Sequence, residues 1–239
     1  MTPPLALVGS GEYLPAMDAV DRVLLAATGK GRARVALLPT AAGLEDFRKW
    51  TDMGCEHFLR LGAEPVPVLA VDRTSCDDAR WADAIIDSDL IYFSGGQPHH
   101  LVASLRGSRV WAAVARRHAE GAVLAGSSAG AMFLAERTFG FPEGFQNDLP
   151  RRVEIYDGMS LLRGILIVPH YDAVPPHVIE RFRHLVPAGL RVLGIDEDTA
   201  LIRLDGRWSV AGKGSVWFLR DGRVENAFAS GTDLPSGLL

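Results

Sequence analysis

The feature that most constrains the fold is a short stretch near the middle of the chain, Val123 to Met132, with the sequence VLAGSSAGAM. Its first residues are apolar and begin with a β-branched side chain, which predicts a buried strand. The Gly-x-Ser-x-Gly pattern centred on Ser128 predicts a sharp turn from that strand into a helix over Ala131 to Glu136. Such a turn exposes a serine hydroxyl at the end of a sheet, while Gly126 and Gly130 leave room for neighbouring backbone. A flexible turn of small residues is the alternative interpretation of this stretch taken alone.

The composition is that of an ordinary globular protein with ample material for a core. Of the 239 residues, 48% are hydrophobic and 23% are charged, and the net charge of -4 gives no electrostatic reason to expect nucleic acid or an anionic membrane as partner. No apolar run is long enough to cross a bilayer, and the opening residues lack the basic region of a signal peptide. Cys55 and Cys76 cannot form a disulfide framework, and reduced thiols fit the cytoplasm. We therefore expect a cytoplasmic protein.

Apolar runs alternate with segments of helical periodicity along most of the chain, which predicts an α/β fold. Because the predicted strands are apolar throughout, we expect one mostly parallel sheet covered by helices on both faces, in a single domain over residues 1–239. Strands are predicted at Leu5–Val8, Val35–Leu38, Val66–Val71, Leu90–Phe93, Leu161–Val168 and Arg191–Ile195, besides the one before Ser128. Helices are predicted at Asp18–Thr28, Glu45–Leu61, Ala79–Ile86, Leu101–Leu105, Val110–Glu120 and Val178–Leu185.

Two later segments depart from this alternation. Phe139 to Arg152 is rich in Gly, Pro, Asn and Asp, which predicts a surface loop of the kind that borders active sites. From Ala200 to Phe228 the pattern alternates by two around Asp205-Gly206 and Asp221-Gly222. This alternation predicts antiparallel hairpins that finish the sheet edge as a small β-meander.

Polar residues that packing would not select follow four of the predicted strands. Because ligands bind at the carboxyl edge of an open parallel sheet, these residues are candidates for a common site. A serine, a histidine and a carboxylate that meet there can act together, since the imidazole accepts the serine proton and the acid holds the imidazole in the required tautomer. The backbone N–H groups of Gly96 and Ala129 are the candidates to stabilise an oxyanion. The strand-end residues are Gly95-Gly96-Gln97, Ser128, His170 and Glu197.

Each of these residues has an alternative interpretation. His170 taken alone could cap a turn, and Glu197 lies in a three-acid cluster that would suit a solvated turn. Ser127 is the alternative nucleophile. The glycine-rich turn from Gly9 to Glu12 lacks a complete nucleotide-binding pattern, so it predicts a plain tight turn.

The histidines do not predict a metal centre. His170, His177 and His184 recur at a constant spacing, but Pro175-Pro176 interrupts any helix that would join the first to the others. No cysteine or carboxylate completes a ligand pattern. We therefore expect neither a metal nor a cofactor.

Four motifs together resemble the S51 serine peptidases, the family that contains aspartyl dipeptidase (peptidase E) and cyanophycinase. They occur in the family's order, from about the first strand to Leu204, with spacings similar to the cyanophycinase branch. The resemblance implies a fold like the class I glutamine amidotransferases, with Ser128 as nucleophile, His170 as base and Glu197 as the orienting acid. It also implies Gly96 and Ala129 as the oxyanion hole. The motifs are Phe93–Gln97, Ala125–Ala131, Pro169-His170 and Gly194–Leu201.

The resemblance also bears on the substrate. It implies that Gln97 orients the substrate. Cyanophycinases carry an arginine-rich stretch after the histidine, whereas Tyr171 to Ile179 contains no arginine, which argues against cyanophycin. Aspartyl dipeptidases need a cation for the aspartate side chain of the substrate. The candidates are Arg181 and Arg183, with Arg151 and Arg152 as further choices, and solvated surface arginines are the alternative for all four.

The sequence thus predicts a serine peptidase that cleaves small peptides through an acyl-enzyme, with aspartyl bonds as the candidate specificity. Serine at the elbow argues against a glutamine amidotransferase, which would carry a cysteine there. The alternatives are a catalytically silent small-molecule-binding protein on the same fold, a cyanophycinase and an esterase-like hydrolase. The resemblance also allows a homodimer, because family members are often dimeric.

Overall fold

The computed structural model describes residues 2–141, 145–146, 149–150 and 152–239. The strands up to the serine turn all lie in one sheet, and most of the described strands that follow the turn form another. The strands are β1 Leu5–Val8, β2 Arg34–Leu38, β3 Glu64–Pro67, β4 Leu90–Phe93, β5 Val123–Ser127, β6 Ala135–Gly140, β7 Phe145–Gln146, β8 Leu149–Pro150, β9 Glu154–Asp157, β10 Leu162–Val168, β11 Arg191–Ile195, β12 Thr199–Leu204, β13 Arg207–Gly212, β14 Ser215–Arg220 and β15 Arg223–Ala229.

The helices alternate with the strands in the first half of the chain, as predicted. They are α1 Asp18–Ala27, α2 Phe47–Arg60, α3 Arg73–Cys76, α4 Ala79–Ile85, α5 Pro98–Leu105, α6 Arg109–Ala119, α7 Ala129–Met132 and α8 Pro176–Arg183. Helices α2 and α6 begin at side-chain caps, with Asp46 and Ser108 accepting backbone N–H groups. Among the described residues, no helix combines the length and the apolar composition that a bilayer crossing requires.

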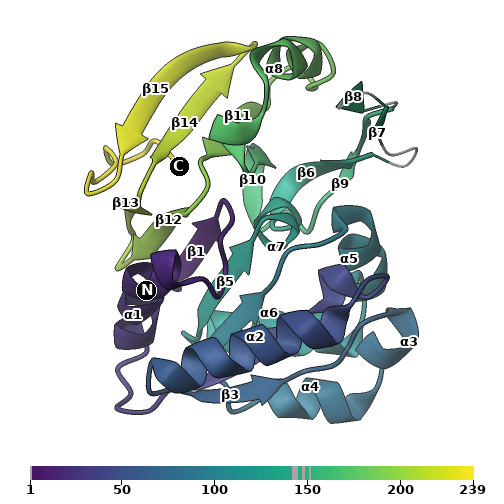
Figure 1. Cartoon of the computed structure of the whole chain (residues 1–239), viewed down its shortest axis with the longest axis vertical. Helices are drawn as coiled ribbons and strands as arrows, with labels where there is room; N and C mark the ends of the chain where they lie inside the picture. The colour runs from purple at the N-terminus through teal and green to yellow at the C-terminus, as the bar shows by residue number, and fades with distance from the viewer. Residues whose placement is uncertain (1, 142–144, 147–148, 151) are drawn as a thin grey trace.

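Two sheets carry the fold (Figure 1). Sheet A has the order β13-β12-β1-β5-β4-β2-β3, and its strands from β1 to β3 are parallel. Sheet B has the order β15-β14-β11-β10-β6-β9, with β6, β10 and β11 parallel to one another. In Figure 1 the strands of sheet B fill the upper half of the molecule, and α7 lies between the two halves.

The α/β class with helices on both faces is therefore confirmed, while the single sheet that the sequence predicts is divided in two. The division begins directly after β5, where the chain passes through the short helix α7 into β6. In the described part of the chain, β6 pairs with β9 and β10 and with no strand of sheet A. The two C-terminal hairpins are antiparallel as predicted, and they are shared between the sheets: β12-β13 pairs with β1, and β14-β15 pairs with β11.

The core shows how the layers are held together. On one face of sheet A, α1 and α2 contribute Leu24 and Phe58 to a cluster with Tyr92. On the other face, α5 and α6 pack into a second cluster that also takes in Ile167 and Phe218 of sheet B. Burial of these apolar side chains stabilises each layer, at about 25 cal/mol per Å² removed from water. Because one cluster contains residues of both sheets, the sheets are fixed against each other by a continuous core.

Three predicted elements differ in the structure. The helix expected over Ala131 to Glu136 is the single turn α7, after which the fully buried Ala135 begins β6. The strand expected at Val66 to Val71 is the edge strand β3, Glu64–Pro67. Among the described strands it pairs with β2 alone, and its free edge tolerates two prolines. The surface loop expected at Phe139 to Arg152 is replaced in part by β6, β7 and β8, and its positions 142–144, 147–148 and 151 lie outside the described residues.

Candidate active site

Ser128 lies at the end of β5, directly before α7, in a backbone conformation that side chains rarely adopt. Its φ of 50° and ψ of -114° place it outside the ordinary helical and extended regions. A strained turn between a strand and a helix is the geometry that a Gly-x-Ser-x-Gly sequence predicts. The local sequence permits it because an ideal Cβ on Gly126 would lie 1.8 Å from the carbonyl oxygen of Gly130. Only glycine lets the two arms of the turn approach this closely.

The turn after β4 lies against this serine. An ideal Cβ on Gly95 would be 3.2 Å from the Ser128 Cβ, so the two backbones are adjacent. Gly96 has a φ of 136°, and a Cβ there would lie 2.5 Å from the carbonyl group of Ala41. In the described part of the chain, the N–H groups of Gly96 and Ala129 have no hydrogen-bond acceptor. They are therefore free to bind an oxygen atom of a ligand.

His170 reaches the serine from the other sheet. It follows β10 and begins a short 3₁₀ turn, Tyr171–Ala173, with left-handed φ and ψ of 51° and 36°. The Tyr171 ring packs over Gly194 of β11, where a Cβ would lie 2.6 Å from the ring, and this packing anchors the turn. The Nε2 atom of His170 lies 3.1 Å from the Ser128 Oγ. The turn thus brings an imidazole within hydrogen-bond reach of the hydroxyl.

Glu197 completes the chain of contacts. It follows β11, and its Oε1 lies 2.7 Å from the Nδ1 of His170. If Nδ1 carries the proton and donates to the carboxylate, Nε2 is left to accept the proton of the Ser128 hydroxyl. The His170 and Glu197 side chains are 41% and 48% exposed, so a substrate and water can reach them.

Two neighbouring aspartates hold the Glu197 loop. The Oδ1 of Asp172 accepts the backbone N–H of Glu197 at 2.8 Å. Asp196 is 6% exposed and accepts bonds from the Ser215 N–H and the Trp217 indole. Burial raises the pKa of Asp196, and these two hydrogen bonds oppose the rise. Because Asp172 lies just after His170, one contact links the loop of the imidazole to the loop of the acid.

Ser127, the alternative nucleophile, is placed differently from Ser128. Its side chain is fully buried, and its hydroxyl donates to the Oε2 of Glu12 at 2.6 Å. Glu12 itself lies in the turn after β1, which the sequence predicts only as a plain tight turn. Neither Glu12 nor Asp172 is among the predicted site residues. The sequence signal that could have identified them is an acidic residue shortly after a predicted strand: Glu12 follows β1, and Asp172 follows β10.

The residues predicted to touch substrate are only partly described. Gln97 is exposed beside Gly96, and its Nε2 donates to the Glu45 Oε1 at 3.0 Å. Arg181 and Arg183 lie on α8, but their side chains are outside the described part of the structure. Arg152 is exposed and bonds to Glu154, and Arg151 lies outside the described residues. Among the residues that the structure describes, no group of three or more His, Cys, Asp or Glu side chains could hold a metal ion.

Comparisons with known proteins support this architecture. The model of peptidase family S51 matches residues 5–210. The crystal structure of a peptidase from an acI-B1 Actinobacterium is similar with a TM-score of 0.84 and 30% identity, over 98% of this chain and 97% of that chain. A second crystal structure, from Listeria monocytogenes EGD-e and provisionally described as a peptidase E protein, has a TM-score of 0.63.

The Listeria protein shares 16% identity, over 89% of this chain and 99% of that chain, and therefore supports the fold alone. No curated protein matches the chain significantly. The family match spans most of the sequence, and the actinobacterial peptidase is similar over nearly its whole length. The chain therefore belongs to peptidase family S51 and is a serine-type peptidase.

Proposed function

We propose that the chain hydrolyses small peptides with Ser128 as nucleophile, His170 as general base and Glu197 as the acid that orients the imidazole. The observation that carries the proposal is the continuous path of contacts from Ser128 Oγ to His170 Nε2, 3.1 Å, and from His170 Nδ1 to Glu197, 2.7 Å. The three residues are far apart in the sequence, and they follow strands of two different sheets. A fold does not need such an arrangement for packing, since two of the three side chains are substantially exposed.

The reaction follows from these positions. The Ser128 oxygen attacks the carbonyl carbon of the scissile peptide bond, and its proton passes to His170 Nε2. The carbonyl oxygen becomes an oxyanion that the N–H groups of Gly96 and Ala129 stabilise. His170 then gives the proton to the departing amine, which leaves an acyl-enzyme. Water, activated by the same imidazole, breaks the acyl bond, releases the acid product and restores the Ser128 hydroxyl.

A substrate with an aspartate next to the cleaved bond is the specificity that we propose. It requires a cation near the site, and the candidates are Arg181 and Arg183, which belong to α8, the helix that follows the 3₁₀ turn after His170. Gln97 follows β4, its side-chain nitrogen Nε2 donates to Glu45, and its side-chain oxygen Oε1 can accept a substrate N–H. No cofactor takes part in this scheme.

Covalent labelling tests the nucleophile. An alkyl fluorophosphonate should label one serine per chain, and peptide mapping should place the adduct on Ser128. Ser128→Ala should abolish both labelling and peptide hydrolysis, with a loss in kcat of at least about 10³-fold. Ser230→Ala, which alters a hydroxyl bonded to the Gly212 carbonyl, is the matched control and should label normally. Hydrolysis that persists in Ser128→Ala would contradict the proposal.

A dipeptide panel tests the specificity separately. Asp-X substrates should be cleaved faster than Asn-X and Ala-X substrates of the same shape. Substitution of the correct arginine, Arg181→Ala or Arg183→Ala, should raise KM for Asp-X by about 10-fold or more and leave Ala-X unchanged. Equal cleavage of Asp-X and Asn-X would reject the aspartyl specificity and leave the nucleophile assignment intact.

A further inference from the structure

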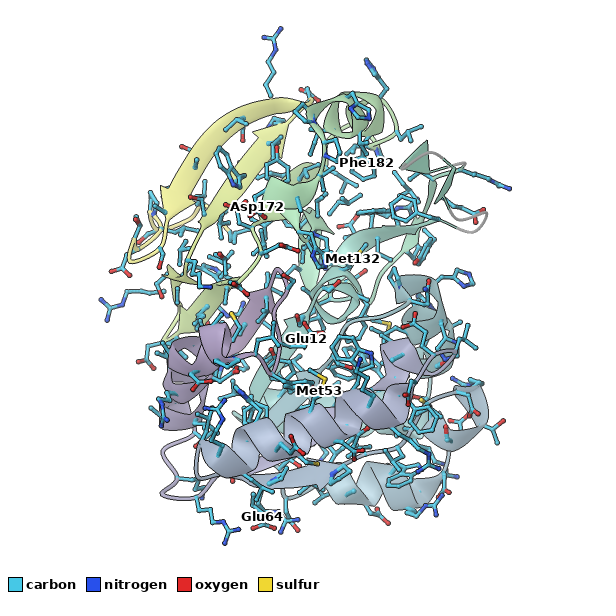
Figure 2. All side chains as sticks on the ribbon, in the orientation of Figure 1. Glu12, Met53, Glu64, Met132, Asp172 and Phe182 are labelled. Atoms are coloured by element: carbon cyan, nitrogen blue, oxygen red, sulfur yellow. The ribbon has the colours of Figure 1, made fainter. Side chains whose placement is uncertain are left out.

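Glu12 is a buried acidic side chain to which the proposed mechanism assigns no role. It lies in the turn after β1 and is 5% exposed. Figure 2 shows it near the middle of the molecule, between the helical lower half and sheet B. Its Oε1 accepts the backbone N–H of Gly95 at 2.7 Å, and its Oε2 accepts the Ser127 hydroxyl at 2.6 Å. Both oxygens of the carboxyl group are therefore engaged.

Both partners of Glu12 are immediate neighbours of the proposed reacting groups. Gly95 precedes Gly96, whose N–H is one proposed oxyanion donor. Ser127 precedes Ser128, the proposed nucleophile, and Ala129, whose N–H is the other proposed oxyanion donor, follows it. The side chain thus joins three strand ends, those of β1, β4 and β5, directly behind the serine.

The turn that carries Gly96 needs a contact that fixes its backbone, such as the hydrogen bond from the Gly95 N–H to Glu12. Gly95 and Gly96 have no side chains to pack, and Gly96 has a left-handed φ of 136°, so their sequence alone leaves the backbone freer than any other pair of residues would. An oxyanion donor has to be held within a fraction of an ångström of its productive position. A hydrogen bond to a side chain that is itself fixed against the elbow supplies that constraint.

We propose that Glu12 is a positioning residue, which fixes the Gly95-Gly96 turn against the Ser127-Ser128 elbow so that the N–H groups of Gly96 and Ala129 converge on one oxygen. This inference rests on the proposed function. Glu12 does not touch the substrate; it acts through the two backbones that do. Its removal should therefore slow the chemical step and leave binding of the ground state nearly unchanged.

A buried acid on helix α1 provides a matched control. Asp21 is fully buried, and its Oδ2 lies 2.7 Å from the Nε2 of His57 on α2. This contact joins two helices, and neither partner belongs to the strand ends at Ser128. Substitution of Asp21 should lower the thermal stability without changing the chemistry at Ser128, so it separates general destabilisation from loss of positioning.

The experiment measures the rate of fluorophosphonate labelling, with the maximal rate and the half-saturating concentration obtained separately, together with Tm for each variant. Glu12→Ala should lower the maximal rate by about 10- to 100-fold with a half-saturating concentration within about threefold of wild type. Glu12→Gln should stay within about threefold of wild type, because its amide oxygen can accept the Gly95 N–H while its NH₂ donates to Ser127 Oγ. Asp21→Asn should lower Tm and leave the rate unchanged.

The outcomes distinguish this inference from the proposed function. If Ser128→Ala abolishes labelling but folded Glu12→Ala labels as fast as wild type, the positioning role is rejected alone. If Glu12→Gln is as slow as Glu12→Ala at wild-type stability, charge rather than position is what matters, and the inference is again rejected. Should Glu12→Ala fail to fold, Ser127→Ala removes one of the two bonds and should slow labelling by about 3- to 10-fold. An unchanged rate in that variant would overturn the inference.

Discussion

The first and last glycines of the serine turn approach each other so closely that an ideal Cβ on Gly126 would lie 1.8 Å from the carbonyl oxygen of Gly130. We predict that Gly126→Ala destabilises the protein by about 3 kcal/mol or more, because the added methyl group meets backbone, which yields less easily than a flexible side chain. For a chain of this size the Tm should fall by about 10 °C. Thermal unfolding measures the fall in Tm, and fluorophosphonate labelling measures how much reactive serine the variant retains.

The matched control is Gly31→Ala, at a glycine with an ordinary φ and open space where the methyl group would be added. It should leave Tm and labelling unchanged. A folded and fully active Gly126→Ala protein would mean that the elbow relaxes far more easily than its packing indicates.

Glu197→Gln should lower kcat for peptide hydrolysis by about 10²- to 10⁴-fold with little change in KM. The amide can still contact His170, but its NH₂ group can donate to Nδ1, which favours the tautomer whose Nε2 cannot accept the serine proton. Steady-state kinetics check this, and Tm serves to show that the fold is retained. A kcat within twofold of wild type would remove Glu197 from the proposed mechanism.

Asp172 tests how the contact between His170 and Glu197 is supported, because its carboxylate accepts the Glu197 N–H at 2.8 Å. Asp172→Ala should lower kcat by about 3- to 10-fold, since the loop that presents Glu197 loses one of its ties. Asp172→Asn keeps an acceptor oxygen and should restore most of the activity. Equal losses in the two variants would show that the charge at this position, and not the hydrogen bond, supports activity.

His118 should make the stability depend on pH. Burial lowers its pKa below the usual 6.5, and the bond to the Ala122 carbonyl opposes this. As the pH falls through 6.5 the unfolded chain takes up a proton that native His118 does not, so the free energy of unfolding decreases. Urea unfolding at pH 7.5 and 5.5 should show lower stability at the acidic value, with a smaller difference in His118→Gln. An equal difference in the two proteins would assign the pH dependence to other groups.

Much of the fold could be predicted because the first half of the chain follows simple rules. Runs such as Leu90–Phe93 are apolar throughout and become buried parallel strands, and the helices between them carry one apolar face. The turn at Ser128 was predictable for a related reason, since a strand followed by Gly-x-Ser-x-Gly leaves the chain few conformations.

The remaining differences come from long-range packing. The segment after Ala131 has good helix formers, but Phe133, Leu134 and Ala135 are fully buried, and the chain turns into β6 to reach sheet B. Tertiary contacts override local propensity there. The position of Glu12 could not be predicted because it depends on Gly95 and Ser127, which lie 83 and 115 residues away along the chain. No local pattern encodes such a contact.

The division of the proposed triad between two sheets has a consequence for the order in which the protein becomes active. The hydroxyl of Ser128 follows a central strand of sheet A, whereas His170 and Glu197 follow strands of sheet B and come later in the sequence. A nascent chain that has formed only the parallel strands β1 to β5 of sheet A contains the proposed nucleophile without the proposed base. If the proposed triad is correct, the protein can hydrolyse peptides only after the last third of the chain has folded against sheet A. Recovery of activity therefore measures complete refolding.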